Sequence, residues 1–418
     1  MGEPYIGRQY YLNHIGDIYS AWSLYRGKGI KIAVIDKGFA PRHEDFINGD
    51  GLSKIDPLSA SFVTNGNATT TEVGIDKVED LGDSHGSFCA GVAAASLNGR
   101  GVIGVAPEAE LLLLRTDGKP KSIAKAFHYA ADNGAKVVSI SIGSYYNYRG
   151  DLVDDGSDLS TVFNEPVSYC RNKGTAIISA AGNGGLEGIP HEYTFPGASK
   201  GVIGAGGLEA NSSTEIWEGT SYNSSPEYAF ADVFAPANGM FGICHYDNKL
   251  YDGGWNGTSF ASPIVAGAAA LYFEKNPTSS VDQFEADLYA SCIPLNESSC
   301  AEASQLGHGR LDIGKLLGIA SSSKEVSIKV NATSPLYCYA WDKNSNKELA
   351  PWPGRQMNKE GDAYTLNLSL GDYSELLFTY GSEGPQTVDI LASSFLYGKA
   401  YDLRNPASEN NRLIGNYV

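Results

Sequence analysis

The sequence lacks the long apolar segments that membrane-spanning helices require. No uncharged apolar run approaches about 20 residues, the length of a helix that crosses a bilayer, and no leader peptide opens the chain. Basic residues are also scarce, because 31 Lys and Arg stand against 48 Asp and Glu, for a net charge of −17. A polyphosphate partner needs a basic footprint. The composition therefore predicts neither a membrane span nor a nucleic-acid partner.

Cysteine is scarce as well, with six residues in 418. Cys292 and Cys300 lie close enough in CIPLNESSC to close a short disulfide loop, and this is the one pairing that spacing suggests. The others have no evident partners: Cys89, Cys170, Cys244 and Cys338. With 42% hydrophobic and 19% charged residues, the chain is typical of a soluble globular protein. We expect a monomer that is secreted or held at the cell surface.

The length predicts two domains. Apolar runs of strand length alternate with helical segments in the first part, which is typical of an α/β fold with a parallel sheet and helices on both faces. The runs are 30–35, 110–114, 136–142, 175–180 and 202–205, and the helical segments are 122–134 and 160–174. Catalytic groups in such sheets gather at the carboxyl ends of the strands.

The pattern of predicted secondary structure changes at the polar stretch SSSK, residues 321–324. Helices are predicted before it at 259–275, 281–291 and 309–319, whereas the segments after it are strands such as VSIKV, LYCYAWD and the alternating TLNLSL. We therefore predict an α/β domain over 1–320, a hinge at 321–324 and a small all-β sandwich over 325–418.

Four short motifs carry groups for nucleophilic catalysis: VIDKG, GDSHGSFCAG, AAGNGG and NGTSFASPIVAG. They supply Asp36, His85, Asn183 and Ser259. A serine hydroxyl needs an imidazole to take its proton, and a carboxylate holds that imidazole in one tautomer. Taken singly, these residues also suit a strand-end turn, a helix cap and a left-handed turn. The complete set favours a catalytic site.

These motifs resemble the signature blocks of the subtilisin-like serine proteases, peptidase family S8, over about residues 8–319. The resemblance implies a serine endopeptidase in which Ser259 attacks the scissile carbonyl, His85 is the general base and Asp36 orients it. Asn183 and the Ser259 N–H would form the oxyanion hole. Catalysis by this set needs no cofactor. The alternative is an inactive homologue that acts only as a glycan-binding protein.

Two further segments resemble the substrate cleft of that family. Ser141-Ile142-Gly143 resembles the edge on which an extended peptide pairs. The segment TFPG, comprising Thr194, Phe195, Pro196 and Gly197, resembles the wall of the pocket for the side chain that precedes the cleaved bond. Ordinary strand and turn roles are the alternative for both segments.

An acidic stretch at 150–158 shares Asp154-Asp155-Gly156 with the kexin-like branch, which suggests a site-specific processing peptidase as an alternative function. Its spacing from Gly143 does not match that branch, so a solvated loop is the preferred interpretation. Relatives bind calcium through a loop equivalent to 97–107, but this loop is short and carries Arg100. We expect any structural calcium to lie elsewhere and name no ligand.

Two residues near the motifs lead to narrower expectations. Cys89 follows His85 at i+4 and so shares its helix face. It is expected to be a small buried hydrophobic residue, with thiol-sensitive activity as the alternative. Pro263 is expected in the first turn of its helix, where the missing N–H has no intrahelical partner.

The block APWPG, with YAW before it and QTVDI after it, resembles the small starch-binding modules over about 330–392. This resemblance implies a platform for α-glucan or another polysaccharide. Its candidate residues are Tyr339, Trp341, Trp352 and Gln386. Small β-domains also bury tryptophan to build a core, and that role is the alternative.

Overall fold

The computed structural model divides the chain into two compact units, Met1–Gly318 and Ile319–Val418. The structure describes residues 3–417 except for 67, 81, 83, 146–157, 160, 193, 211, 226–228, 245–249, 296–300, 320–324, 343–347, 370–372, 374, 392–399 and 410–411. The predicted hinge at 321–324 lies outside the described residues. Within them, no helix is both long and apolar enough to span a membrane.

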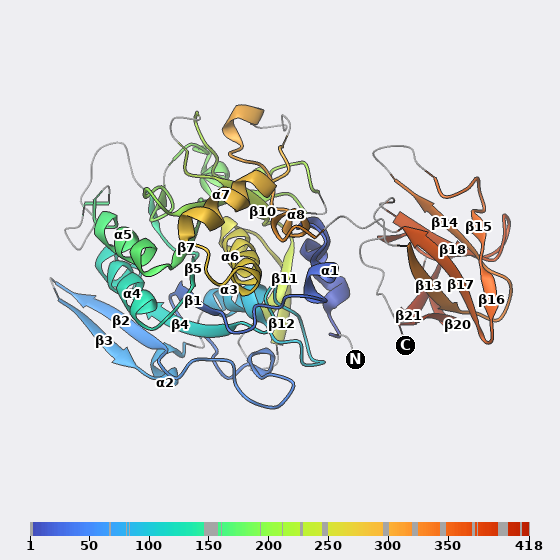
Figure 1. Ribbon diagram of the computed structural model, residues 1–418, viewed down its shortest axis with the longest axis horizontal. Helices are drawn as coiled ribbons and strands as arrows, with labels where there is room; N and C mark the ends of the chain where they lie inside the picture. Colours follow the sequence, from blue (N-terminus) through green and yellow to red (C-terminus); the bar gives the residue numbers. More distant parts are fainter. Residues whose placement is uncertain are drawn as a thin grey trace. The chain divides into compact units, whose positions relative to one another are not determined.

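An eight-stranded sheet forms the centre of the first unit (Figure 1), with strand order β10-β9-β7-β5-β1-β4-β2-β3. All neighbouring pairs are parallel except β2 with β3. The strands are β1 Lys31–Asp36, β2 Ala60–Asn65, β3 Ala68–Val73, β4 Glu110–Thr116, β5 Val137–Ile140, β7 Ala176–Ala180, β9 Ile203–Leu208 and β10 Val233–Pro236. The five predicted apolar runs are β1, β4, β5, β7 and β9.

Helices cover both faces of this sheet, as predicted. Successive side chains of a strand point to opposite faces. Val138 and Ile140 of β5 share a core with α4 (Pro120–Asp132) and α5 (Asn164–Lys173). Ser139 between them lies 3.3 Å from Ser262 of α6 (Thr258–Lys275), with Oγ facing Oγ. The α6 helix therefore covers the opposite face, together with α3 (His85–Ala94).

The remaining elements of this unit are short. They are helices α1 Ile18–Trp22, α2 Ile75–Val78, α7 Val281–Ser291 and α8 Ile313–Leu316, strands β6 Ser144–Tyr145, β8 Thr194–Phe195, β11 Met240–Cys244 and β12 Leu250–Trp255, and 3-10 turns at Ile6–Arg8, Tyr10–His14, Glu44–Phe46, Gly184–Glu187 and Ala303–Gln305. The prediction of a helix over 309–319 is wrong for its first half. There Arg310 forms β-bridges with Phe234 and Ile293, and the helix begins only after Asp312 caps it.

The second unit is a β-sandwich. One sheet has the order β16-β17-β13-β20-β21 and the other β15-β14-β18-β19. Apolar side chains of both sheets form one core, including Ile328, Leu366, Cys338 and Phe378. The strands are β13 Glu325–Asn331, β14 Tyr337–Trp341, β15 Arg355–Gln356, β16 Asn358–Glu360, β17 Ala363–Ser369, β18 Glu375–Thr379, β19 Ile390–Leu391, β20 Ala400–Glu409 and β21 Arg412–Tyr417.

Candidate active site

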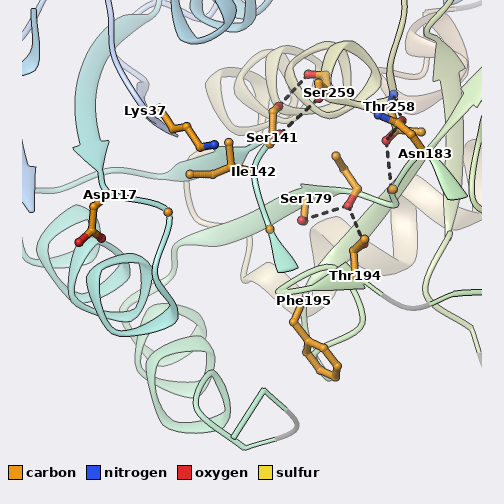
Figure 2. A pocket seen from close by; sticks show the side chains of 14 residues that line it. Lys37, Asp117, Ser141, Ile142, Ser179, Asn183, Thr194, Phe195, Thr258 and Ser259 are labelled. Atoms are coloured by element: carbon orange, nitrogen blue, oxygen red, sulfur yellow. Dashed lines mark hydrogen bonds between the residues drawn. The ribbon is translucent and has the colours of Figure 1, made fainter. Parts of the chain in front are cut away.

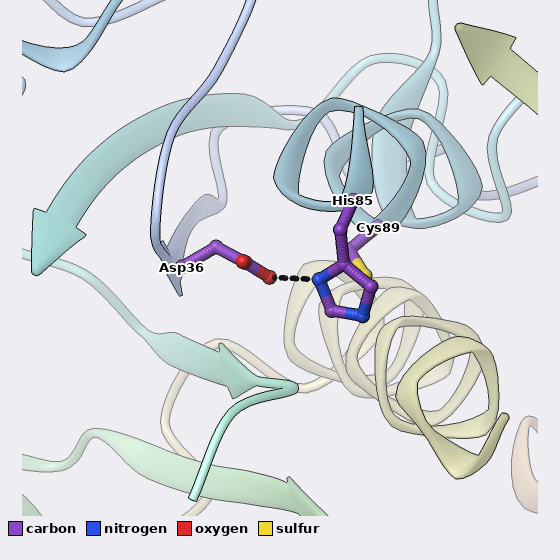
Figure 3. Close-up of side chains that lie close together, drawn as sticks. All are labelled: Asp36, His85 and Cys89. Atoms are coloured by element: carbon purple, nitrogen blue, oxygen red, sulfur yellow. Dashed lines mark hydrogen bonds and ion pairs between the residues drawn. The ribbon is translucent and has the colours of Figure 1, made fainter. Parts of the chain in front are cut away.

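Asp36 and His85 meet at the carboxyl end of the central strand. Asp36 ends β1, is fully buried, and has its Oδ2 2.8 Å from His85 Nδ1, while its Oδ1 accepts the N–H of Lys37 (Figure 3). His85 opens α3. A Cβ on the next residue, Gly86, would lie 2.3 Å from the Gly38 carbonyl oxygen and 2.9 Å from Asp36 Cβ. Only glycine lets α3 begin this close to β1, so Gly86 is part of what brings the carboxylate and the imidazole together.

Ser259 lies at the start of the long helix α6, as its second residue. The helix is preceded by Gly257, whose φ of +154° favours glycine. A Cβ on Gly257 would lie 3.6 Å from Asn183 Nδ2 and 3.7 Å from Ser259 N, so the amide group and the backbone N–H approach the same spot. The N-terminus of a long helix also favours negative charge.

The orientation of the Asn183 amide is set by the first residue of α6. Asn183 Oδ1 accepts hydrogen bonds from the N–H and the hydroxyl of Thr258, both at 3.0 Å. Thr258 Oγ1 in turn accepts the N–H of Gly182 at 3.1 Å. Because Oδ1 is engaged with Thr258, the donor end of the amide, Nδ2, is turned towards Gly257.

Pro263 is the sixth residue of α6 and not, as expected, part of its first turn. Its missing N–H would have bonded to the carbonyl of Ser259, four residues earlier. That carbonyl is instead bonded by Ser141 Oγ at 2.7 Å and by Cys89 Sγ at 3.3 Å. In return, Ser259 Oγ donates to the Ser141 carbonyl at 3.3 Å. The helix tolerates proline because two side chains supply the lost donor.

Cys89 is fully buried, which agrees with the packing role predicted for it. Its sulfur and the nearest ligand atoms of Asp36 and His85 lie within 4.8 Å of one another, a spacing that a metal ion would also require. Each of these groups already has a partner within the protein. All five described cysteines are free thiols, while Cys300, the predicted partner of Cys292, lies outside the described residues.

The cleft beside Ser259 has a volume of about 320 Å³ (Figure 2). Five of the predicted substrate-binding residues line it: Ser141, Ile142, Gly143, Thr194 and Phe195. The other two, Pro196 and Gly197, are buried and are not among the residues that line the cleft, so substrate binding stays a prediction for them. Packing explains this burial, because a Cβ on Gly197 would lie 2.9 Å from the Ala180 carbonyl oxygen of β7.

The cleft is also lined by seven residues that the sequence analysis did not predict. They are Lys37, Asp117, Gly118, Ser179, Ala180, Gly182 and Thr258. Most of them end or directly follow the strands β1, β4 and β7. The carboxyl ends of parallel strands share one edge of the sheet, so their position after predicted strands was the available signal. The acidic stretch at 150–158 lies outside the described residues except for Asp158.

Backbone N–H groups of the loop at 97–107 point to two buried carboxylates. Glu3 Oε1 accepts the N–H groups of Asn98 and Gly99, and Asp45 Oδ2 accepts the N–H of Val102. Calcium is bound by oxygen atoms, whereas this loop presents N–H donors to both carboxylates. The loop N–H groups therefore bond one oxygen of each carboxylate. Glu3 Oε2 and Asp45 Oδ1 stay buried without a partner, and desolvation raises the pKa of both carboxyls, that of Asp45 to about 7.

In the second unit, the three aromatic candidates for glycan binding lie close together. Tyr339 stacks on Trp341 with ring centroids 5.4 Å apart, and Trp352 meets Tyr339 edge-on at 5.4 Å. Trp352 is 44% exposed. Gln386 is half-buried and forms a β-bridge with Thr379 of β18. On β14, Tyr339 and Trp341 alternate with the core residues Cys338 and Ala340. They therefore face away from the core of the sandwich.

The fold and the site together define a subtilisin-like class of structure. They combine a hydrogen-bonded Asp-His pair, a serine at the start of a long helix and a parallel sheet with helices on both faces. The model of the subtilase family matches residues 27–309. Subtilisin DY from Bacillus licheniformis and thermitase from Thermoactinomyces vulgaris are each 30% identical over 66% of this chain and 87% of their own length. The chain belongs to the subtilase family and is a serine endopeptidase.

Solved structures share the fold at lower identity. A protease structure from Pseudoalteromonas arctica has a TM-score of 0.60 at 23% identity, covering 76% of this chain and 98% of its own. The epidermin leader peptide processing serine protease of Staphylococcus aureus has a TM-score of 0.61 at 23% identity, covering 75% of this chain and 80% of its own. At this identity the likeness concerns the fold alone.

Proposed function

We propose that the protein is a secreted endopeptidase that hydrolyses peptide bonds through an acyl-enzyme on Ser259. The observation that carries the proposal is the 2.8 Å contact between Asp36 Oδ2 and His85 Nδ1. It holds the imidazole in the tautomer with its proton on Nδ1, so that Nε2 is the acceptor. In Figure 3 that second nitrogen lies on the side of α6, and the imidazole centroid is 5.9 Å from the ring of Phe260, the neighbour of Ser259.

The first chemical step needs one rotation of the serine side chain. Ser259 Oγ donates to the Ser141 carbonyl in the free enzyme. When a peptide pairs along 141–143, the hydroxyl turns to His85 Nε2, which takes its proton as the oxygen attacks the scissile carbonyl. Asp36 stabilises the imidazolium that forms. The imidazolium then protonates the leaving amine, and an acyl-enzyme remains on Ser259.

The carbonyl oxygen gains negative charge in this step. The Ser259 N–H and Asn183 Nδ2 donate to it beside Gly257, a role supported by the closeness of both groups to Gly257, where the absence of a side chain leaves room. Water then enters after the amine departs, and His85 activates it to hydrolyse the ester by the reverse sequence. The side chain before the cleaved bond enters the part of the cleft lined by Gly143, Thr194 and Phe195.

The experiment is active-site labelling followed by cleavage mapping. A fluorophosphonate probe is expected to modify Ser259 in the wild type and not in Ser259→Ala, while the exposed helix residue Ser168 provides the control Ser168→Ala with labelling intact. Mass-spectrometric mapping of casein peptides then decides specificity. Many sites support a digestive endopeptidase, whereas a single site supports a processing peptidase. Failure of Ser259 to react would favour the inactive homologue.

We further propose that the second unit binds α-glucan or a related polysaccharide through Tyr339, Trp341 and Trp352. The support is the cluster that the half-buried Tyr339 and Trp341 on the outer face of β14 form with the exposed Trp352, since ring faces stack on the C–H surfaces of sugars. In a starch pull-down of the full chain, Trp352→Ala is expected to weaken binding by about tenfold, and Trp352→Phe to retain most of it. Wild-type protein that stays in the supernatant would overturn this proposal.

A further inference from the structure

Lys37 is a charged residue of the cleft for which the proposed mechanism has no role. It directly follows Asp36 at the end of β1, and its side chain is exposed. The Cε atom lies 3.5 Å from the position that a Cβ on Gly118 would take, so the side chain runs along the backbone of Gly118. Figure 2 shows the ammonium group next to Ile142, with Phe195 on the far side of the 141–143 segment.

The carboxylates around Lys37 already have partners. Asp117 lies 3.8 Å from the ammonium group of Lys119 and also accepts the backbone N–H of Lys119. Asp80 pairs with Arg115 at 2.7 Å. The carboxylate of the preceding residue is bound to the imidazole. Across the described part of the chain, the ammonium group of Lys37 forms no ion pair. Among the residues that the structure describes, the cleft therefore carries a cation that no carboxylate pairs with, in a protein of net charge −17.

The direction of an extended substrate decides which of its side chains meets this cation. Successive side chains of a strand point to opposite sides. If the residue before the scissile bond enters the pocket lined by Thr194 and Phe195, the residue before that one points to the opposite side of the 141–143 segment. Lys37 lies on that side and adjoins the Asp36–His85 pair, where the reaction occurs.

We infer that Lys37 selects an acidic side chain, aspartate or glutamate, at the second residue before the cleaved bond. This inference rests on the proposed function and names its substrate class. An ammonium–carboxylate hydrogen bond is stronger than one to a neutral amide, and a bound peptide covers Lys37 and reduces its contact with water. The net negative charge of the enzyme makes a preference for acidic substrates unexpected on composition alone.

The test compares two fluorogenic peptides that differ only in aspartate or asparagine at this position. The readout is the ratio of their kcat/KM values on one enzyme. We expect a ratio of about three to ten for the wild type, near one for Lys37→Gln, below one for Lys37→Glu, and close to the wild-type value for Lys37→Arg. Raising the salt concentration should narrow the wild-type ratio, because it screens the charges. A wild-type ratio near one, or an unchanged ratio in Lys37→Gln, would overturn the inference.

A binding measurement separates this inference from the proposed chemistry. The Kd values of the same two peptides are measured on Ser259→Ala and on Ser259→Ala combined with Lys37→Gln. Tighter binding of the aspartate peptide to the first variant, lost in the second, supports the inference even if the wild type hydrolyses neither peptide. Absence of hydrolysis would contradict the proposed function, whereas equal Kd values on Ser259→Ala would contradict the inference alone.

Discussion

Pro263 releases the carbonyl of Ser259 from the hydrogen-bond ladder of α6, four residues before the proline. Ser141 Oγ and Cys89 Sγ bind the released oxygen at 2.7 and 3.3 Å. Ser141 comes from the chain after β5 and Cys89 from α3. The backbone of Ser259 is therefore held by two other elements, the segment after β5 and the helix that carries His85.

This arrangement makes Ser141 a positioning residue for Ser259. We expect Ser141→Ala to lower kcat by about tenfold, because a buried carbonyl loses its stronger donor. Ser141→Thr keeps the hydroxyl and should retain most of the activity. A general loss of stability would act on the amount of active enzyme, so kcat is normalised to the titrated active-site concentration. Wild-type kcat in Ser141→Ala would show that the second donor is sufficient.

Two substitutions of Asn183 separate the role of its donor atom, Nδ2, from that of its acceptor atom, Oδ1. Asn183→Ala is expected to lower kcat by about 100- to 1,000-fold with little change in KM, because the oxyanion loses one donor. Asn183→Asp keeps the acceptor for Thr258 and loses Nδ2, so it should be at least as inactive. Asn133→Ala, which removes an amide bonded to the Tyr129 carbonyl at the end of α4, is the control. An active Asn183→Asp enzyme would refute the role of Nδ2 as donor.

Modification of Cys89 should impair activity. Its sulfur lies within 4.8 Å of the Asp36 and His85 ligand atoms and donates to the Ser259 carbonyl. A mercurial on this sulfur has to displace the imidazole, so we expect partial inactivation of the wild type and none of Cys89→Ala. Cys170, a buried residue of α5, provides the control Cys170→Ala with wild-type sensitivity. Full activity after modification of Cys89, verified by intact mass, contradicts the expectation.

The buried carboxyl of Asp45 predicts a pH-dependent stability. Desolvation raises its pKa in the folded protein to about 7, above the unfolded value of 3.8. The folded state therefore holds the proton more tightly between these values, and the free energy of unfolding falls as pH rises from about 4 to about 7. A shift of this size corresponds to at most about 4 kcal/mol.

Asp45→Asn cannot ionise and still accepts the Val102 N–H. We expect its melting temperature to exceed that of the wild type by several degrees at pH 8, and by much less near pH 4. The exposed residue Asp50 allows a control with the same change of charge, Asp50→Asn. A melting-temperature difference that is the same at both pH values would argue against a buried ionisation at this position.

Much of the catalytic unit could be predicted because its strands are continuously apolar. Both faces of β1, β4, β5 and β7 are covered, so local composition alone identifies them. The β2–β3 hairpin was missed because β3, ATTTEV, is exposed at the edge of the sheet and carries no apolar signal. The helix expected from 309 was shortened because the tertiary β-bridges of Arg310 override its local helix propensity.

The amino-acid sequence by itself determined which chemical groups are available and that each follows a strand or opens a helix. Asp36, His85, Asn183 and Ser259 were identified in this way, because their immediate neighbours are part of the signal. The tertiary structure alone shows that Ser141 and Cys89 replace the donor lost at Pro263 and that N–H groups face Glu3 and Asp45. It also shows that Lys37 enters the cleft with no carboxylate partner among the described residues. These contacts join residues far apart in the chain, and their existence depends on the order of strands in the sheet, which no local pattern encodes.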